Sequence, residues 1–452
     1  MINMKQSDPR LLAVTALQRF DESGDFLAEI LDSFIDLSEL SRLDRGLFTE
    51  LVYGTVRMRL NLDYIIQQFS SRPLKKIDPA VRQVLRIGAY QLLYLDRVPP
   101  SAAVNEAVKA ARRLSHQGTA GFVNGLLRNI DRQKNRITYP DPNQQPVEYL
   151  SYRYSFPKWM AELCLKQWGL AETEKLFQAL NEPPKTALRV NTLHSSVDAL
   201  RQHFTAKGAR VEPGNFAPDV LLVNPGHYAV ADSLLAEGAY YIQDEGSALV
   251  AHAVDPQPGE VVYDLCSAPG GKSTHMAQLM KNQGTIVAWD ISRERLAKVD
   301  ENSQRLGISI VETRQGDASA PLDAPQADRV LVDAPCSGLG TMGHRPDIRW
   351  RKSPDEIAEL AALQRKILAN AAQVVKPGGR LVYSVCTLTE SEGPDNASWF
   401  LKTFSEFVPD SLPPWFPAPS NTESAWYRQF LPHRHGTDGF FIASFARKKL
   451  TE

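Results

Sequence analysis

The stretch Val261-Val262-Tyr263-Asp264-Leu265-Cys266-Ser267-Ala268-Pro269-Gly270-Gly271-Lys272 decides the fold. It joins a short apolar strand, Val261 to Cys266, to a glycine-rich turn, and a helix from Lys272 to Met280 is predicted to follow. Strands and helices alternate in this way from about residue 237 onward, which predicts a doubly wound parallel sheet. Four further strands are predicted, at Thr285 to Trp289, Ile308 to Glu312, Asp328 to Val332 and Arg380 to Val385.

The glycine-rich turn lies where open parallel sheets bind ligands, outside the carboxyl ends of the strands. Two adjacent glycines allow the backbone to approach a ligand closely. Gly271-Lys272-Ser273 resembles the end of a phosphate-binding loop, but Cys266 occupies the position where that loop needs glycine,. An NTPase is therefore disfavoured. The absence of G-x-G-x-x-G weakens a dinucleotide site in the same way.

Two carboxylates follow the next strands. Asp290 closes the second strand, 20 residues beyond Gly270, where an acid can accept hydrogen bonds from ribose hydroxyls. Asp317 follows the third strand and could receive an adenine amino group. This set suits a nucleoside without a pyrophosphate, such as S-adenosylmethionine. The structural alternative is that both acids cap helices or lie solvated in loops.

Two cysteines follow later strands and bear on the reaction. If the strands before Cys336 and Cys386 are neighbours, both thiols face one cleft, although an isolated cysteine is usually a small buried core residue. Thiolate addition at C6 of cytosine makes C5 nucleophilic enough to take a methyl group from a sulfonium. Asp333 could hold the N3/N4 edge of the base, or it could merely cap its turn. Spacing does not say which cysteine attacks.

The N-terminal part has a different character. Asp8-Pro9 and Asp78-Pro79 are typical helix starts, and residues 1–140 are predicted to be helical. Residues 42–140 carry 17 basic and 7 acidic residues, a net charge of +10, in a chain whose net charge is −1. Such a segment favours contact with a polyanion, although a solvated helical surface is the alternative. The predicted RNA-contact residues are Lys109, Arg112, Arg113 and Arg128.

Length and composition set the frame. A chain of 452 residues with 43% apolar content predicts several domains: a helical domain at 1–140, a small α+β module at 147–236, and the sheet domain at 237–452. No apolar run reaches the roughly 20 residues of a membrane span, and the polar Met1 to Pro9 stretch predicts no secretory signal. Four scattered cysteines predict no metal site and a reducing, cytoplasmic setting,.

The sheet domain resembles the RNA cytosine-C5 methyltransferase family, the Nol1/Nop2/Sun group. The resemblance is carried by the strings Asp264 to Lys272, Val332 to Gly338 and Tyr383 to Thr387. It implies a Rossmann-like fold that binds S-adenosylmethionine, with Cys386 as nucleophile and Cys336 assisting release of the product. The cofactor and base pocket would be lined by Cys266, Ser267, Ala268, Pro269, Gly270, Gly271, Lys272, Asp290, Asp317 and Asp333.

Further strings extend the resemblance: Arg189-Val190-Asn191, Gln243 to Ser247, His344 to Trp350 and Asp438 to Phe441. One departure is Glu390 to Asn396, where the family has an acid-rich stretch and this chain has Gly393-Pro394. The first 140 residues resemble a NusB-like RNA-binding domain through Val104 to Val108 and Phe122 to Arg128.

The domain order resembles a bacterial small-subunit rRNA methyltransferase. That likeness implies a monomeric enzyme acting on 16S rRNA, away from membranes, at the cytosine conventionally numbered 967. Three alternatives stay open. The chain could methylate a cytosine in tRNA or another rRNA, it could be a non-catalytic RNA-binding factor, or it could be an NAD-dependent oxidoreductase that has no task for Cys386.

Overall fold

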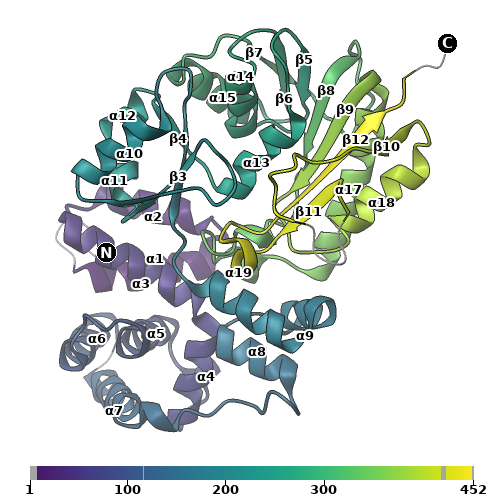
Figure 1. The fold of residues 1–452 in the computed structure, drawn as a ribbon. Helices are drawn as coiled ribbons and strands as arrows, with labels where there is room; N and C mark the ends of the chain where they lie inside the picture. Colours follow the sequence, from purple (N-terminus) through teal and green to yellow (C-terminus); the bar gives the residue numbers. More distant parts are fainter. Residues whose placement is uncertain (1–7, 116, 419–423, 450–452) are drawn as a thin grey trace. The chain divides into compact units, whose positions relative to one another are not determined.

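The computed structural model describes residues 8–115, 117–418 and 424–449, and Figure 1 names its elements along the chain. The chain divides into two compact units: Met1–Glu182 with Arg345–Arg351, and Pro183–His344 with Lys352–Glu452. The boundaries predicted at 140, 147 and 236 stay predictions, because a compact unit can hold more than one domain. Among the described residues, no helix is both long and apolar enough to cross a membrane.

The first unit is helical, as predicted. Its first helix begins at Pro9, where the Asp8 carboxylate accepts a hydrogen bond from Arg10 N at 2.8 Å. Helix α9 is broken at Gly169, whose φ of 74° separates its two helical segments. The helices are α1 (Pro9–Ser23), α2 (Leu27–Leu37), α3 (Arg42–Arg57), α4 (Arg59–Phe69), α5 (Pro79–Tyr94), α6 (Pro100–Leu114), α7 (Gln117–Gln133), α8 (Pro146–Tyr154) and α9 (Lys158–Asn181), with short turns η2 (Leu74–Lys76) and η3 (Lys134–Arg136).

A short segment from the C-terminal half completes this unit. It contains α16 (Ile348–Arg351), and its Arg349 is fully buried. Arg349 Nη1 donates to Asn181 Oδ1 at 2.9 Å, and its guanidinium lies 4.0 Å from the Phe156 ring centroid. Trp350 Nε1 donates to the Val56 carbonyl at 2.8 Å. Burial lowers the pKa of Arg349 well below its ordinary value. The sequence does not predict this docking.

The second unit begins with a small antiparallel sheet in the order β2-β3-β1-β4. Its strands are β1 (Thr186–Val190), β2 (Arg210–Pro213), β3 (Val220–Asn224) and β4 (Tyr240–Ile242). The buried Leu200 and Phe204 of α10 (Val197–Ala206) pack against it, and α11 (His227–Val230) and α12 (Ser233–Ala236) follow β3. This is the predicted α+β character.

The large sheet has the order β10-β12-β9-β8-β5-β6-β7, with β11 paired to β12. The five predicted strands are parallel to one another, as predicted, and β12, which is not among the predicted strands, adds antiparallel to β9, so the sheet is mixed. The strands are β5 (Val261–Asp264), β6 (Thr285–Asp290), β7 (Val311–Gln315), β8 (Ala327–Asp333), β9 (Val375–Val385), β10 (Phe407–Pro409), β11 (Tyr427–Phe430) and β12 (Phe440–Arg447).

The third parallel strand begins later than predicted. Its predicted start, Ile308, is buried and closes the preceding helix, because Ile308 N donates to the Ser303 carbonyl at 2.9 Å. The strand therefore begins only at Val311.

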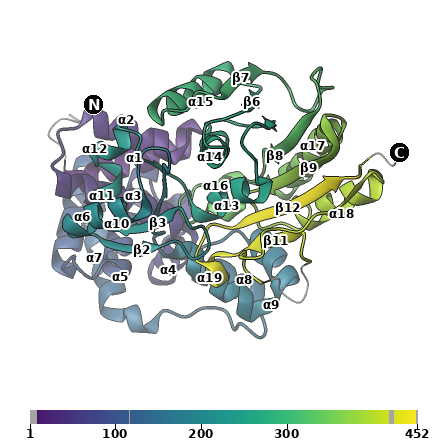
Figure 2. The ribbon, with the colours of Figure 1, turned by 45° about the horizontal axis from the view of Figure 1, so that its top comes forward.

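Helices cover both faces of the large sheet (Figures 1 and 2). α13 and α14 pack on the face that carries Val262 and Ile286, whereas α17 packs on the face that carries Tyr263 and Val330. The strand alternation thus divides the core into two layers. The helices of this part are α13 (Glu245–Val254), α14 (Gly271–Leu279), α15 (Arg293–Arg305), α17 (Pro354–Gln373), α18 (Pro394–Thr403) and α19 (Pro432–His435), with the turn η4 (Leu339–Thr341).

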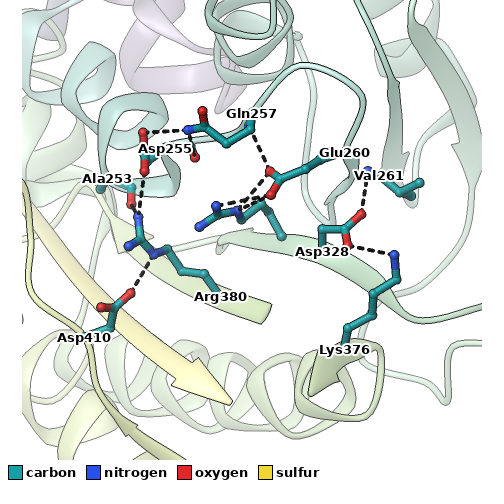
Figure 3. A network of polar contacts seen from close by, with 10 residues as sticks. Ala253, Asp255, Gln257, Glu260, Val261, Asp328, Lys376, Arg380 and Asp410 are labelled. Carbon is teal, nitrogen blue, oxygen red and sulfur yellow. Dashed lines mark hydrogen bonds and ion pairs between the residues drawn. The ribbon is translucent and has the colours of Figure 1, made fainter. Parts of the chain in front are cut away.

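Ion pairs join the amino ends of the central strands, and Figure 3 shows this network from close by. Each carboxylate there lies beside a cation contributed by a neighbouring strand or its flank. The pairs are Glu260–Arg329 at 3.0 Å, Asp328–Lys376 at 2.7 Å and Asp410–Arg380 at 2.6 Å.

Candidate active site

The loop after β5 forms the floor of the site. Gly270 has a φ of 97° and caps α14, and a Cβ there would lie 3.1 Å from the Val299 Cα of α15. Glycine is therefore required both by the left-handed backbone and by the close packing. Arg189 of β1, fully buried, donates hydrogen bonds to the Gly271 carbonyl and to Thr274 Oγ1, the latter at 3.1 Å. It fixes the start of α14, and the sequence offers it only as part of a resemblance string.

Asp264, the last residue of β5, is fully buried beneath this loop. Ser273 Oγ donates to one carboxylate oxygen at 2.6 Å, while the other oxygen has no hydrogen-bond partner among the described residues. Burial raises the pKa of Asp264 to about 7; the Ser273 hydrogen bond opposes this, and the charge of Asp333 adds to it. A carboxyl group poised near neutrality thus lies directly under the loop.

Asp333 ends the neighbouring strand β8 and lies between two donors. Lys272 Nζ contacts one carboxylate oxygen at 2.6 Å, and Ser384 Oγ donates to the other at 2.7 Å. Burial alone would lower the pKa of Lys272, but the Asp333 charge outweighs it, and the net pKa is raised. The Lys272 ammonium also lies 5.2 Å from the Phe440 ring centroid. The pair is therefore ionic and oriented.

The two predicted cysteines come together, as expected if their strands are neighbours. Cys336 follows β8, Cys386 follows β9, and their sulfur atoms are 3.2 Å apart. The loops are tied by backbone hydrogen bonds: Ala334 N donates to the Ser384 carbonyl at 3.0 Å, and Gly340 N to the Cys386 carbonyl at 3.0 Å. The contact with Cys386, followed by burial, raises the pKa of Cys336 well above its ordinary value.

The other two predicted acids, Asp290 and Asp317, accept hydrogen bonds from the turns around them. Asp290 is buried; its oxygens accept from Ala268 N at 3.3 Å and from Ser292 N at 3.0 Å. It therefore lies against the loop after β5. Asp317 is exposed, and it accepts hydrogen bonds from the backbone and hydroxyl of Ser319 at 2.8 and 2.7 Å, which lower its pKa. Both acids follow strands on the same side of β5, at the carboxyl edge of the sheet.

Some buried polar side-chain atoms near the loop after β5 make no hydrogen bond among the described residues. Within the described part of the chain, Ser267 Oγ, Asp264 Oδ1 and Trp289 Nε1 are buried and have no hydrogen-bond partner. Buried polar groups are nearly always satisfied, so Ser267 Oγ in the loop and Asp264 Oδ1 beneath it fit a polar ligand there. Cys266 is half-buried. Burial is the main cause that raises the pKa of its thiol well above the ordinary value, so the side chain is a thiol rather than a thiolate.

The predicted RNA-contact residues lie on two adjacent helices of the first unit. Lys109, Arg112 and Arg113 are exposed on α6, and Arg128 is exposed on α7. Lys109 pairs with Glu106 at 2.7 Å. Lys109 and Arg112 line an open groove of about 1180 Å³ between the two helices, and Arg113 and Arg128 are not among its lining residues.

Comparison with known proteins decides the family. A family model described as "16S rRNA methyltransferase RsmB/F" matches residues 251–446. A "Probable ribosomal RNA small subunit methyltransferase B" from Bacillus subtilis (strain 168) is 39% identical over 451 residues, covering 98% of this chain and 100% of that protein. The chain belongs to the RsmB/F family of 16S rRNA methyltransferases. The "Ribosomal RNA small subunit methyltransferase B" of Salmonella paratyphi B is 32% identical over 447 residues, which cover 98% and 100% of the two chains.

Family models also match the other parts of this RsmB/F member. "NusB family" matches residues 7–132, and a RsmF/B-like "ferredoxin-like domain" matches residues 156–229. They confirm the NusB-like helical part and the small α+β module. The crystal structure titled PH0851 is similar, with a TM-score of 0.78 and 30% identity, covering 97% and 99% of the two chains. The structure of NSun6 from Pyrococcus horikoshii with SFG has a TM-score of 0.60 and 25% identity, covering 66% and 100%.

Proposed function

We propose that this chain transfers a methyl group from S-adenosylmethionine to C5 of a cytosine in 16S rRNA, at the position conventionally numbered 967. The observation that supports this most directly is the 3.2 Å contact between the Cys336 and Cys386 sulfurs beside the loop after β5. Family membership supports rRNA methylation as such; the cytosine, the carbon atom and the position are the proposal.

The cofactor would be held by residues Cys266 to Lys272 and by Asp290 and Asp317. Ser267 Oγ is buried and has no hydrogen-bond partner among the described residues, and the two acids suit ribose and adenine. When bound, S-adenosylmethionine supplies a methyl group on a positively charged sulfur. Asp333 would hold the N3/N4 edge of the cytosine, because Lys272 and Ser384 fix one carboxylate oxygen each and every carboxylate oxygen can accept a further hydrogen bond,.

The two thiols divide the covalent chemistry. Cys386, after loss of its proton, adds to C6; the S–C6 bond forms, the ring electrons shift toward N3, and N3 takes up a proton. C5 thereby becomes enamine-like and nucleophilic. Once C5 carries both a methyl group and its original proton, the Cys336 thiolate removes the C5 proton, the C5–C6 double bond forms again, the Cys386 thiolate leaves, and N3 gives back to solvent the proton that it had gained.

The experiment uses the full-length protein, labelled S-adenosylmethionine and unmodified 16S rRNA, supplied either deproteinised or within small-subunit particles. We expect incorporation that bisulfite sequencing maps to one cytosine, position 967, and a loss of about 10³-fold or more with Cys386→Ala. Full incorporation by Cys386→Ala would refute the nucleophile. Methylation mapped to another nucleotide, or to tRNA, would refute the substrate.

The helical part would bind the RNA. Arg112 and Arg113 are exposed cations, and each phosphate contact that they make would release counterions,. Removing both side chains with alanine should flatten the slope of log affinity against log salt by roughly 1 to 2. Lys376→Ala, at the amino edge of the large sheet, is the matched control. We also propose the division into parts at 1–140, 147–236 and 237–452, and a monomer acting in the cytoplasm.

A further inference from the structure

Glu392 lies in the loop between β9 and α18, and it is fully buried. One carboxylate oxygen accepts hydrogen bonds from Ser337 N at 2.7 Å and from Gln364 Nε2 at 3.1 Å. The other accepts from three hydroxyls: Ser337 at 2.6 Å, Thr387 at 2.7 Å and Thr389 at 2.8 Å. Five donors around one carboxylate compensate the cost of removing its charge from water.

These donors belong to the two cysteine loops. Ser337 follows Cys336 directly and Thr387 follows Cys386 directly. The Glu392 carboxylate therefore binds the residue next in sequence to each cysteine. The two hydroxyls also contact each other at 2.8 Å. Each hydroxyl has a single proton, and because both protons go to Glu392 the loops are joined beside the thiols through its carboxylate,.

A helix anchors this junction. Gln364 of α17 donates to the Pro335 carbonyl at 3.0 Å as well as to Glu392. The side-chain amide oxygen of Gln364 accepts hydrogen bonds from Tyr383 Oη at 3.0 Å and from Asn396 Nδ2 at 2.8 Å. The junction is thus held by β9, α17 and α18, all rigid elements of the sheet domain. Glu392 does not reach solvent, so it has no access to substrate.

We propose that Glu392 is the positioning residue that holds the Cys336 and Cys386 sulfurs in contact. This rests on the proposed function, because two successive thiol steps on neighbouring ring carbons need both sulfurs at one place. Misplacing a reacting group by about 1 Å can cost about 10²-fold in rate. A carboxylate that draws both loops onto one centre prevents such a displacement.

The first test measures the geometry and requires no methyl transfer. Dibromobimane becomes strongly fluorescent only after both of its arms alkylate nearby thiols, so its fluorescence reports whether the two sulfurs are adjacent. We expect a high yield in the full chain, and only background in Cys336→Ser. Glu392→Gln should lose most of the fluorescence, because an amide NH2 group must now face hydroxyls or an N–H that previously donated.

Glu245→Gln is the matched control. Glu245 is also buried, and its carboxylate accepts from three backbone N–H groups, of Asn215, Phe216 and Ala217, at 3.0, 2.6 and 2.8 Å. The Glu245→Gln substitution removes a buried carboxylate charge that accepts several hydrogen bonds, and it changes no contact of either cysteine loop. We expect a loss of thermal stability comparable to that of Glu392→Gln, with dibromobimane fluorescence at the level of the unaltered chain.

The second test separates positioning from binding. For Glu392→Gln we expect kcat to fall by about 10²-fold, while KM for S-adenosylmethionine and for rRNA stays within about twofold of the unaltered value. If Glu392→Gln does not fold, Thr387→Val removes one hydroxyl donor at similar volume and should lower both fluorescence and kcat by a smaller factor.

The outcomes distinguish the two proposals. Unchanged fluorescence and kcat in a folded Glu392→Gln, or an equal fluorescence loss in Glu245→Gln, overturns the positioning role and leaves the proposed function standing. If the unaltered chain does not methylate rRNA but Glu392→Gln still loses fluorescence, the proposed function fails while the positioning of the thiols stands.

Discussion

The two ends of strand β8 carry the same chemical pair in different surroundings. Near its start, Asp328 pairs with Lys376 at 2.7 Å, with side chains that are 29% and 42% exposed. At its end, Asp333 pairs with Lys272 at 2.6 Å, with side chains that are 24% and 13% exposed. The first pair belongs to the satisfied network of Figure 3. The second lies beside a buried carboxyl with an unpartnered oxygen and two thiols in contact.

The contrast suggests a division of roles within one sheet: residues at the amino edge contribute to stability, and residues at the carboxyl edge contribute to the chemistry. At the amino edge, the Asp328–Lys376 pair is partly exposed, so water screens it and it contributes little,. At the carboxyl edge, burial strengthens every interaction and leaves groups whose protonation is shifted. Substitutions at the carboxyl edge should therefore change activity, and matched substitutions at the amino edge should not.

The largest effect is expected from Cys336→Ala. Without a thiol to remove the C5 proton, the Cys386–C6 bond should persist, so turnover should fall by about 10³-fold or more and the protein should remain attached to RNA. A denaturing gel with labelled rRNA measures the adduct directly. Cys386→Ala is the control that should give no adduct. Normal turnover by Cys336→Ala would remove this cysteine from the reaction.

Asp333→Asn should have the next largest effect. The amide keeps the shape but loses the charge that raises the Lys272 pKa, so the lysine loses its ionic partner and the base loses a fixed acceptor. We expect kcat to fall by about 10²-fold or more, as for other lost electrostatic contacts in active sites. Asp328→Asn makes the same change at the other end of the strand. Equal kcat losses in the two variants would contradict the division between the edges.

Much of this contrast could be predicted from the sequence. Parallel strands bring their carboxyl ends to one edge, so Cys336, Cys386 and Asp333 can be grouped from strand order alone. The predicted third strand begins three residues early, because the apolar Ile308 belongs to the end of α15 rather than to the sheet. The string at Asp438 to Phe441 is visible in the sequence, but an apolar run near the chain end does not reveal that β12 adds antiparallel to β9.

Residues with long-range partners could not be predicted. Glu392 stands out in the sequence only as part of a departure from the family, since its donors come from the two cysteine loops and from α17. Arg349 has the same character, because its partners in the helical unit are more than 160 positions away in sequence. In both cases a charged side chain is fully buried, and burial is a property of the fold that spacing does not show.

A smaller effect is expected on the pH dependence of stability through Asp264. Its folded-state pKa of about 7 lies above the ordinary value of 3.8, so the folded protein holds a proton that the unfolded chain has lost. Stability should therefore fall as pH rises from about 4 to 7, by at most about 1.4 kcal/mol for each pH unit. Asp264→Asn should flatten this difference in urea unfolding. A slope identical to that of the unaltered chain would mean that Asp264 ionises normally.

The smallest effect is expected from Lys376→Met at the amino edge. Burial alone would raise the pKa of Asp328. The hydrogen bonds from Lys376 and from the Val261 N–H outweigh burial, so the net pKa lies below its ordinary value. The pair therefore adds stability above the unfolded-state pKa of Asp328, and that stability is lost as pH falls through the folded-state pKa. Since the lysine is 42% exposed, its loss should cost about 1 kcal/mol or less, and less still at high salt. Urea unfolding at two salt concentrations measures this, and methyl transfer should be unchanged. A loss of kcat in this variant, with the fold intact, would show that the amino edge takes part in the chemistry after all.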